Sequence, residues 1–517
     1  MKRTEDAPKL IIWLERAIIF WLFVFAVFAP HSIAVTQGAW LIGMVLWAVR
    51  LLVFPRPKTY RTPIDYALLA FFILTGFSAF LSYEPFVSIG KLRAASLFTI
   101  VYLFVQNVPS PRVARLLALT LIASCMANVA YTAATRIIGR GIKVETVSAD
   151  SPLSAAVWFA QGKRVPFPIV SGDTLLEVDG LRLYDARQLA EALDSSRGTT
   201  AARVKIYRAE FVPTLNIPRG RLLAAGTPEG QLGISGWSKS RDWRATGFYS
   251  HWVTYSQALQ LIASLALGLL LALPLKLSRT GALLLIALAG LSFALLLTVT
   301  RASWLGLLVS AALMVVVGTS RRTILILGAL AIPIILAGLF LLQQQRRVGF
   351  VDQKDASITW RETVWREGFD LLISKPRHLL VGVGMDSLKA HWREWGLFDK
   401  GRIPVGHMHS NFLQIALERG IPALLAWLIL LGVYARTLWR TTHCLAKYPM
   451  QAQQAGETIG DWADRGIVLG ALGALAGFFT SGFVHYNWGD STVMMIFYFI
   501  MALALVIERE NRSAAAA

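Results

Sequence analysis

The sequence is poor in charged residues and in cysteine. Only 16% of its 517 residues are charged, whereas a soluble domain has about 25%. The two cysteines, Cys125 in an apolar stretch and Cys444 in a basic one, indicate neither a disulfide framework nor a metal cluster. The sequence also lacks a His-Glu-x-x-His zinc motif, a Walker loop and a Gly-x-Ser-x-Gly elbow, which disfavours the enzyme classes that depend on them.

The sequence instead has many long apolar runs. Hydrophobic residues make up 55% of the chain, and its mean hydropathy is +0.53. Twelve runs come near the roughly 20 residues that a helix needs to cross the hydrocarbon core of a bilayer. The pattern therefore predicts an α-helical polytopic membrane protein with twelve transmembrane helices. The predicted spans are 11–29, 33–54, 64–82, 88–107, 114–138, 252–274, 281–299, 302–318, 323–342, 410–435, 465–485 and 490–507.

Basic residues concentrate before the first span and in the loops that follow the even-numbered ones. The formal net charge is +20, which in a soluble protein would suggest a nucleic-acid partner. Cytoplasmic loops of membrane proteins are enriched in Lys and Arg, so topology accounts for the charge and no nucleic-acid partner is expected. Both termini are predicted to be cytoplasmic. The residues that carry this pattern include Lys2, Arg56, Arg112, Lys276, Arg321 and Arg436.

Two groups of basic residues lie on the predicted outer side. Lys91 and Arg93 are near the outer end of the fourth span, where they either extend to lipid head groups or form an anion site. The outer loop 343–409 is rich in arginine, and loops of this length largely escape the charge rule. The basic loop therefore does not contradict the predicted topology.

The predicted outer segment 139–250 forms a domain of its own. It is predicted to contain a strand, an Asp179-Gly180 turn, a helix over Ala186–Leu193 and a strand over Val204–Arg208, an order that resembles a PDZ domain. In that case Gly141–Val144 would supply the loop and strand that bind a peptide C-terminus through backbone N–H groups. The alternative is an insert with a purely structural role.

Three polar sites lie at the predicted outer edge of the membrane. Arg301 sits in a tight turn between two apolar spans, where it either marks a functional site or extends to the interface. Arg361 and Trp365 share one face of a predicted helix over 357–373, which suits a phosphate beside a sugar ring or is an interfacial face. His409 begins the tenth span, where a neutral imidazole either accepts a proton or simply starts the helix.

Short motifs follow one another across the second half of the chain. They are Arg244–His251, Thr298-x-x-Arg301, Arg361-x-x-x-Trp365, Gly382-x-Gly384, and His409–Gln414 followed by Glu418–Pro422. In this order, and on one side of the membrane, they resemble the O-antigen ligase and polymerase superfamily. The resemblance extends from 240 to 507 and more loosely over the first five spans. It implies a GT-C-like membrane fold, in which the PDZ-like insert is not a usual feature.

The resemblance implies an enzyme of the bacterial inner membrane that transfers a glycan on the periplasmic face. The reaction would be inverting and would need neither a metal nor a cofactor, and the donor would be a glycan on undecaprenyl diphosphate. Arg301 and Arg361 would neutralise the departing diphosphate, and His409 would take the proton of the acceptor hydroxyl. Further substrate-binding residues would be Lys91, Arg93, His251, Trp365 and Asp490, and Trp304 and Trp392 could stack on sugars.

The acceptor stays open among three choices. Ligation to lipid A–core is favoured, polymerisation would extend one lipid-linked glycan with another, and protein O-glycosylation would let the PDZ-like insert recruit a peptide or protein partner. A non-enzymatic transporter of lipid-linked glycans is the alternative class. A transporter predicts polar or broken spans near the middle of the bilayer, whereas the ionisable residues here gather at the outer edge.

The predicted organisation has five parts, and membrane lipids are expected to surround the spans. Residues 1–138 contain the first five spans, 139–250 the periplasmic insert, 251–342 spans six to nine, 343–409 a periplasmic catalytic loop, and 410–517 the last three spans with a cytoplasmic tail.

Overall fold

The long apolar runs fold into a bundle of helices. The computed structural model of the chain describes residues 9–160, 163–194, 200–208, 212–241, 243–322, 356–401, 406–455 and 462–516. Within these residues, ten helices are long and apolar enough to cross a membrane, and the apolar helix α3 (Asp65–Phe80) is shorter. The protein is thus a multi-pass α-helical membrane protein, as predicted. The ninth predicted span, 323–342, lies outside the described residues.

The helices outside the insert run from α1 near the N-terminus to α19 near the C-terminus. They are α1 (Lys9–Phe28), α2 (Ile33–Leu52), α3, α4 (Pro85–Ala95), the 3-10 helix η1 (Ser96–Phe98), α5 (Thr99–Asn107), α6 (Pro111–Ile138), α9 (Trp252–Ala272), α10 (Arg279–Leu297), α11 (Arg301–Gly318), α13 (Ala356–Ile373), α14 (Pro376–Val381), α15 (Ser387–His391), α16 (Leu397–Gly401), α17 (Asn411–Ala455), α18 (Trp462–Ser481), η3 (Asn487–Gly489) and α19 (Ser491–Ala516).

Helices α9, α18 and α19 form the buried centre of the bundle. Glycines let α9 and α18 pack closely, because a Cβ at Gly268 would overlap the backbone of Gly470. Close approach through small residues is a general device of membrane helices, which gain no hydrophobic free energy by leaving lipid for one another. The contact fixes α9 against α18.

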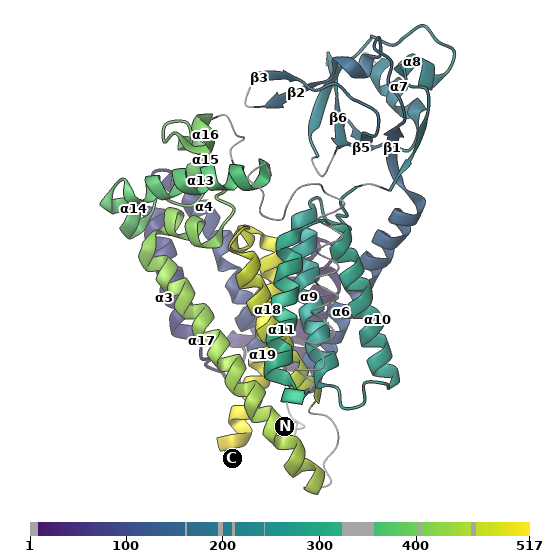
Figure 1. The fold of residues 1–517 in the computed structure, drawn as a ribbon. Helices are drawn as coiled ribbons and strands as arrows, with labels where there is room; N and C mark the ends of the chain where they lie inside the picture. The colour runs from purple at the N-terminus through teal and green to yellow at the C-terminus, as the bar shows by residue number, and fades with distance from the viewer. Residues whose placement is uncertain are drawn as a thin grey trace.

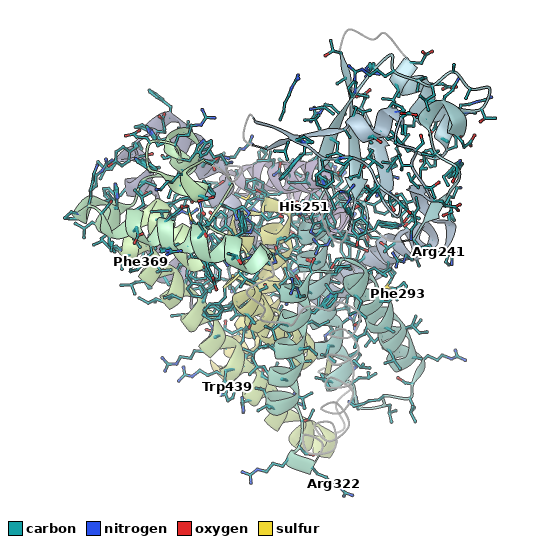
Figure 2. All side chains as sticks on the ribbon, turned by 45° about the horizontal axis from the view of Figure 1, so that its top comes forward. Arg241, His251, Phe293, Arg322, Phe369 and Trp439 are labelled. Carbon is teal, nitrogen blue, oxygen red and sulfur yellow. The ribbon has the colours of Figure 1, made fainter. Side chains whose placement is uncertain are left out.

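The bundle has two chemically different ends. Both chain termini lie at one end, called the termini end, and the insert lies at the other, called the insert end (Figure 1). Helices α13 to α16 also lie at the insert end, beside the insert. Figure 2 shows His251 near the middle of this end and Arg322 at the opposite one.

The insert is an antiparallel sheet with two short helices. The strands run in the order β3-β2-β7-β6-β4-β1-β8, with β5 paired to β4. Asp179 and Gly180 both have positive φ and form the predicted turn between β4 and β5. The elements are β1 (Arg140–Val144), the 3-10 helix η2 (Pro152–Ala155), β2 (Val157–Ala160), β3 (Lys163–Pro166), β4 (Thr174–Val178), β5 (Leu181–Arg182), α7 (Ala186–Asp194), β6 (Ala201–Tyr207), β7 (Thr214–Pro218), α8 (Pro228–Leu232) and β8 (Trp237–Ser240).

The structure contradicts the predicted peptide-binding strand of the insert. Strand β1 contains Gly141–Val144 and pairs with β4 on one edge and with β8 on the other. An added peptide strand needs a free sheet edge, so β1 cannot bind a peptide in this way. The prediction was wrong because the strand that covers this edge, β8, is about a hundred residues away in the sequence. The resemblance to a PDZ domain stays a prediction.

Candidate active site

A large cavity lies at the insert end of the bundle. Its volume is about 1300 Å³, and its walls come from α4, α9, α11, α13, α17 and the segment 484–491. Six of the eight predicted site residues line it, namely Lys91, His251, Arg301, Arg361, His409 and Asp490. Side chains that are hundreds of residues apart in the sequence therefore share one space.

Basic and titratable side chains dominate the polar part of the cavity lining. The basic residues are Lys91, Arg244, Arg301, Arg361 and Lys389, and the acidic ones are Asp386, Glu418 and Asp490. The cavity also holds His251, His407, His409 and His485, which are half of the histidines in the chain. The excess of basic residues favours an anionic ligand.

The backbone around His409 is held in a strained conformation. His409 has a φ of +48°, which is unfavourable for a residue with a Cβ and persists only where the surroundings fix it. Asn411 supplies that support: its backbone N–H donates to Gly482 at 2.8 Å, and its side-chain oxygen accepts from the N–H of Trp488 at 3.0 Å. Gln414 accepts from the N–H of Met408 at 2.6 Å. The residues of the His409–Gln414 motif thus place one imidazole.

The ring of His409 is packed against aromatic and cationic neighbours. Its centroid lies 4.4 Å from that of Trp360, edge to face, and 4.1 Å from that of His407. Burial, followed by the proximity of His407, His485 and Arg361, lowers the pKa of His409 to about 2. The imidazole is therefore neutral at pH 7. Its Nδ1 is buried and makes no hydrogen bond within the described residues.

Arg244 and Arg301 meet at the turn between α10 and α11. Val299 in this turn has a φ of +52°, and Arg301 is the first residue of α11. The guanidinium of Arg244 donates to the carbonyl oxygen of Val299 at 2.5 Å and lies over the ring of Trp252 at 5.0 Å. The turn therefore brings two arginines to one wall of the cavity, as well as the N-terminal N–H groups of α11, which favour anions.

Trp365 does not line the cavity, and its role in substrate binding stays a prediction. Helix α13 confirms the predicted helix, and Arg361 on it reaches the cavity. The indole Nε1–H of Trp365 instead donates to the carbonyl oxygen of Met408 at 2.8 Å. A shared helix face predicts that two residues point in a similar direction, but not how far each reaches. Trp365 holds the backbone next to His409. Trp392 is also absent from the lining, whereas Trp304 is part of it.

His251 and Asp490 each start a helix at the cavity wall. The Nδ1 of His251 accepts from the N–H of Val253 at 3.2 Å, at the N-terminus of α9. Asp490 accepts from the N–H of Thr492 at 3.0 Å, at the N-terminus of α19, and from the hydroxyl of Thr254 at 2.5 Å. Burial lowers the pKa of His251, and Arg244 lowers it further against the opposing effect of Asp490. Both side chains have structural partners as well as a place in the lining.

Lys91 and Arg93 have different surroundings. The ammonium of Lys91 lies 2.6 Å from Asp386, which also binds Lys389 at 3.1 Å. Burial raises the pKa of Asp386, but the two lysines outweigh it, and the pKa is lowered overall. Arg93 is exposed on α4 and does not line the cavity, and its role in substrate binding stays a prediction. Positions two apart on a helix face different directions.

A sharp bend in α17 supports the site. Gly420 has a φ of +83°, and Pro422 follows it, where the missing N–H permits a kink. The turn after α14 packs into the bend: Val383 and Gly384 donate backbone hydrogen bonds to Leu417 and Glu418 at 2.8 and 2.9 Å. The Gly382-x-Gly384 and Glu418–Pro422 motifs are therefore one structural unit.

Part of the chain matches a known protein family. Residues 286–428 match the family model described as O-antigen ligase. The chain carries a domain of the O-antigen ligase family. No curated protein matches the chain significantly. The match contains Arg301, Arg361 and His409, together with the unit formed around Gly420.

The O-antigen ligase domain supplies only part of the cavity. Lys91, His251 and Asp490 come from elements on either side of the matched residues. Within the described residues, no group of three or more His, Cys, Asp or Glu side chains is arranged to hold a metal ion. The cavity of the O-antigen ligase domain is therefore completed by the bundle around it.

Several cavity residues were not assigned to the site from the sequence. Each of two had a signal in the sequence: Arg244 begins the Arg244–His251 motif, and His407 lies two residues before His409. His485 had no such signal, because its position depends on how the segment after α18 packs against the start of α17. Lys389 reaches the cavity from α15 and forms an ion pair with Asp386.

Proposed function

We propose that the protein transfers a glycan from undecaprenyl diphosphate to an acceptor hydroxyl, with lipid A–core as the favoured acceptor. The convergence of Arg301, Arg361 and His409 on one cavity carries this proposal. The cavity combines cations for a diphosphate with a neutral imidazole for a hydroxyl proton. The match to the O-antigen ligase family supports the same class of reaction. On the positive-inside rule, the insert end faces the periplasm.

The reaction is a single displacement at the anomeric carbon. The acceptor oxygen attacks from the face opposite the diphosphate, a new glycosidic C–O bond forms, and the C–O bond to the diphosphate breaks. The proton of the hydroxyl passes to His409, and undecaprenyl diphosphate leaves. Arg301 and Arg361 stabilise the negative charge that develops on the leaving group. Such a displacement inverts the anomeric configuration.

The low pKa of His409 makes it dependent on the donor. In the ligand-free cavity, burial and the nearby cationic groups disfavour the imidazolium. A bound diphosphate adds negative charge beside the ring, and an opposite charge within a few ångströms favours the protonated form. His409 therefore becomes an effective base when the donor is in place. Without the donor, the hydroxyl proton has no good acceptor.

The test is glycan transfer in vitro from an undecaprenyl-diphosphate glycan, with and without lipid A–core. Glycan on lipid A–core that is lost in His409→Ala supports ligation. Longer lipid-linked chains made without lipid A–core would instead assign polymerase activity, and modification of an added protein would assign protein O-glycosylation. Normal transfer by His409→Ala or by Arg361→Ala would refute the proposed mechanism.

A further inference from the structure

Arg419 is a buried arginine that the proposed reaction does not use. Its side chain is only 6% exposed, and it lies eight residues beyond the start of α17, or about 12 Å along the helix axis. Its Nη2 approaches the sulfur of Met385 at 3.5 Å, and its guanidinium lies 5.5 Å from the centroid of Phe71. The Nε and Nη1 atoms are buried and make no hydrogen bond within the described residues.

The neighbouring carboxylate of Glu418 makes its hydrogen bonds to groups other than Arg419. Glu418 accepts from the side-chain amide of Gln414 at 2.8 Å, from the N–H of Asp386 at 3.2 Å and from the hydroxyl of Tyr486 at 3.3 Å. These neutral donors hold both of its oxygens. No ion pair between Arg419 and a carboxylate occurs among the residues that the structure describes. A buried guanidinium that donates only to a thioether sulfur, with Nε and Nη1 lacking partners within the described residues, is costly, and inside a membrane such a charge generally marks a functional position.

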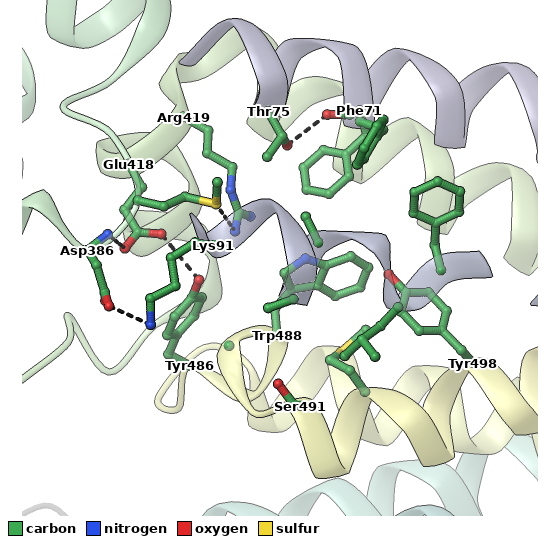
Figure 3. Close-up of a pocket in the computed structure, with 18 of the residues that line it drawn as sticks. Phe71, Thr75, Lys91, Asp386, Glu418, Arg419, Tyr486, Trp488, Ser491 and Tyr498 are labelled. Atoms are coloured by element: carbon green, nitrogen blue, oxygen red, sulfur yellow. Dashed lines mark hydrogen bonds and ion pairs between the residues drawn. The ribbon is translucent and has the colours of Figure 1, made fainter. Parts of the chain in front are cut away.

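Arg419 faces a second cavity, which is smaller than the first. Its volume is about 150 Å³, and its walls come from α3, α4, the kink of α17 and the start of α19 (Figure 3). Most of the wall is aromatic or aliphatic, with Phe71, Phe72, Phe98, Trp488 and Tyr498 among its residues. The polar end holds Arg419, Glu418 and the Lys91–Asp386 ion pair (Figure 3). The polar end therefore presents one buried guanidinium beside carboxylates that already accept hydrogen bonds, and the rest of the cavity is apolar.

The two cavities adjoin but differ in their arginines. Lys91, Asp386, Glu418 and Tyr486 line both. Arg301 and Arg361 line only the large cavity, and Arg419 lines only the small one. The donor diphosphate has its cations in the large cavity, so Arg419 is available to a second anionic group that arrives at the same wall.

We propose that the small cavity binds the phosphate end of a lipid-borne acceptor, with Arg419 contacting the phosphate and hydrocarbon lying on the aromatic wall. The role of this lipid as acceptor rests on the proposed glycan transfer, whereas the binding of a phosphate-bearing lipid does not. A lipid fits better than a free ion because the walls of the cavity come from apolar helices and are mostly aromatic or aliphatic. The acceptor class is then a membrane lipid that carries phosphate, and not a protein hydroxyl.

The binding test uses Trp488 as a reporter inside the cavity. The full chain is placed in nanodiscs of dioleoylphosphatidylcholine that contain either dibrominated phosphatidic acid or dibrominated phosphatidylcholine. The difference in emission between the wild type and Trp488→Phe isolates the signal of Trp488. We expect brominated phosphatidic acid to quench that signal and brominated phosphatidylcholine to quench it at least threefold less.

Substitution of Arg419 decides whether its guanidinium causes the preference for phosphatidic acid. Arg419→Gln, compared with and without Trp488→Phe, should lose the preference for phosphatidic acid. Arg509→Gln is the matched control, because Arg509 is equally buried at the termini end and should leave the preference intact. A preference that survives Arg419→Gln, or equal quenching by the two lipids, would overturn the proposed phosphate site.

An activity measurement then tests whether the bound lipid is the acceptor. Arg419→Gln should raise the KM for lipid A–core several-fold and leave the KM for the undecaprenyl-diphosphate glycan unchanged. A higher KM for the donor instead would overturn the acceptor assignment and place the donor lipid in the small cavity. If the wild type transfers no glycan at all, the proposed function fails, whereas the quenching result for Arg419 still decides the lipid site.

Discussion

The two ends of the bundle use arginines in different ways. At the termini end, Arg115 donates to Asp464 through two nitrogen atoms, at 2.6 Å for Nε. Arg509 donates to the carbonyl oxygens of Val105 and Val108, at 2.5 and 2.9 Å. These guanidinium groups tie one helix to another, so their hydrogen bonds are part of the fold.

At the insert end, the carboxylates are occupied by other groups. Asp386 binds two lysines, Asp490 caps α19, and Glu418 accepts from neutral donors. Arg301, Arg361 and Arg419 line cavities. Several arginines at the insert end therefore line cavities, whereas Arg115 and Arg509 at the termini end hold helices together. Substitutions of arginine at the insert end should mainly change activity, and those at the termini end should mainly change stability.

The largest expected effect is at His409. His409→Asn should lower the rate of transfer by about 10²–10⁴-fold, the usual contribution of a general base, with little change in melting temperature. His443→Asn is the control, because His443 is an exposed histidine on α17, the helix that follows His409. The measurement is transfer under donor saturation together with thermal unfolding in detergent. Equal activity of the two variants would remove His409 from the mechanism.

Arg361 tests whether the shape of the guanidinium matters. Arg361→Lys keeps the charge but loses the planar donor pair that binds phosphate oxygens, so transfer should fall by about 10²–10³-fold. Arg366→Lys, at an exposed position on the same helix, should have no such effect. Should both variants retain activity, Arg361 would contribute only general electrostatic attraction.

Gly382 tests the support of the site by the bend in α17. Gly382 has φ +75° and ψ −171°, a region that only glycine adopts readily, and a Cβ would overlap the backbone of Glu418. Gly382→Ala should therefore lower both the melting temperature and transfer, with a loss of stability above about 3 kcal/mol. Gly396→Ala is the control, since Gly396 also has positive φ but open space around it. It should lose only about 1–2 kcal/mol. Similar losses in the two variants would argue against the packing of this turn on α17.

Arg509 and Arg419 give the most direct comparison of the two ends. Arg509→Gln leaves buried carbonyl oxygens without donors and should destabilise the protein by about 1–3 kcal/mol. Arg419→Gln removes a buried charge that has no such partners and should leave the melting temperature unchanged or raise it. Thermal unfolding of both variants in the same detergent measures the difference. The reverse order of stabilities would mean that Arg419 has a structural role.

The smallest expected effect is on the pH dependence of stability. His409 has a folded-state pKa of about 2 and an ordinary value of 6.5, so the unfolded state binds more protons between these values. Stability is then fully present above pH 6.5 and decreases as the pH falls below it. His409→Asn should lose less melting temperature than the wild type between pH 7.5 and pH 4.5. An identical acid dependence of the two proteins would contradict the burial of a neutral His409.

The sequence by itself determined the class of the protein and most of its helices. Apolar runs of about 20 residues have few alternatives to a membrane helix, because every backbone group must be satisfied internally in lipid. The motifs around Arg301, Arg361 and His409 were also visible, and the family match contains all three. These features depend on local residue order, which the sequence states directly.

The tertiary structure decided which side chains share a cavity and which do not. It brought His485 and Arg244 to the lining, turned Trp365 onto the backbone of Met408, and left Arg93 exposed. It also covered both edges of β1 and placed Arg419 in a cavity of its own. Each outcome depends on contacts between segments that are distant along the chain, and on the direction of side chains around a helix axis. Residue spacing does not contain that information, so only packing could supply it.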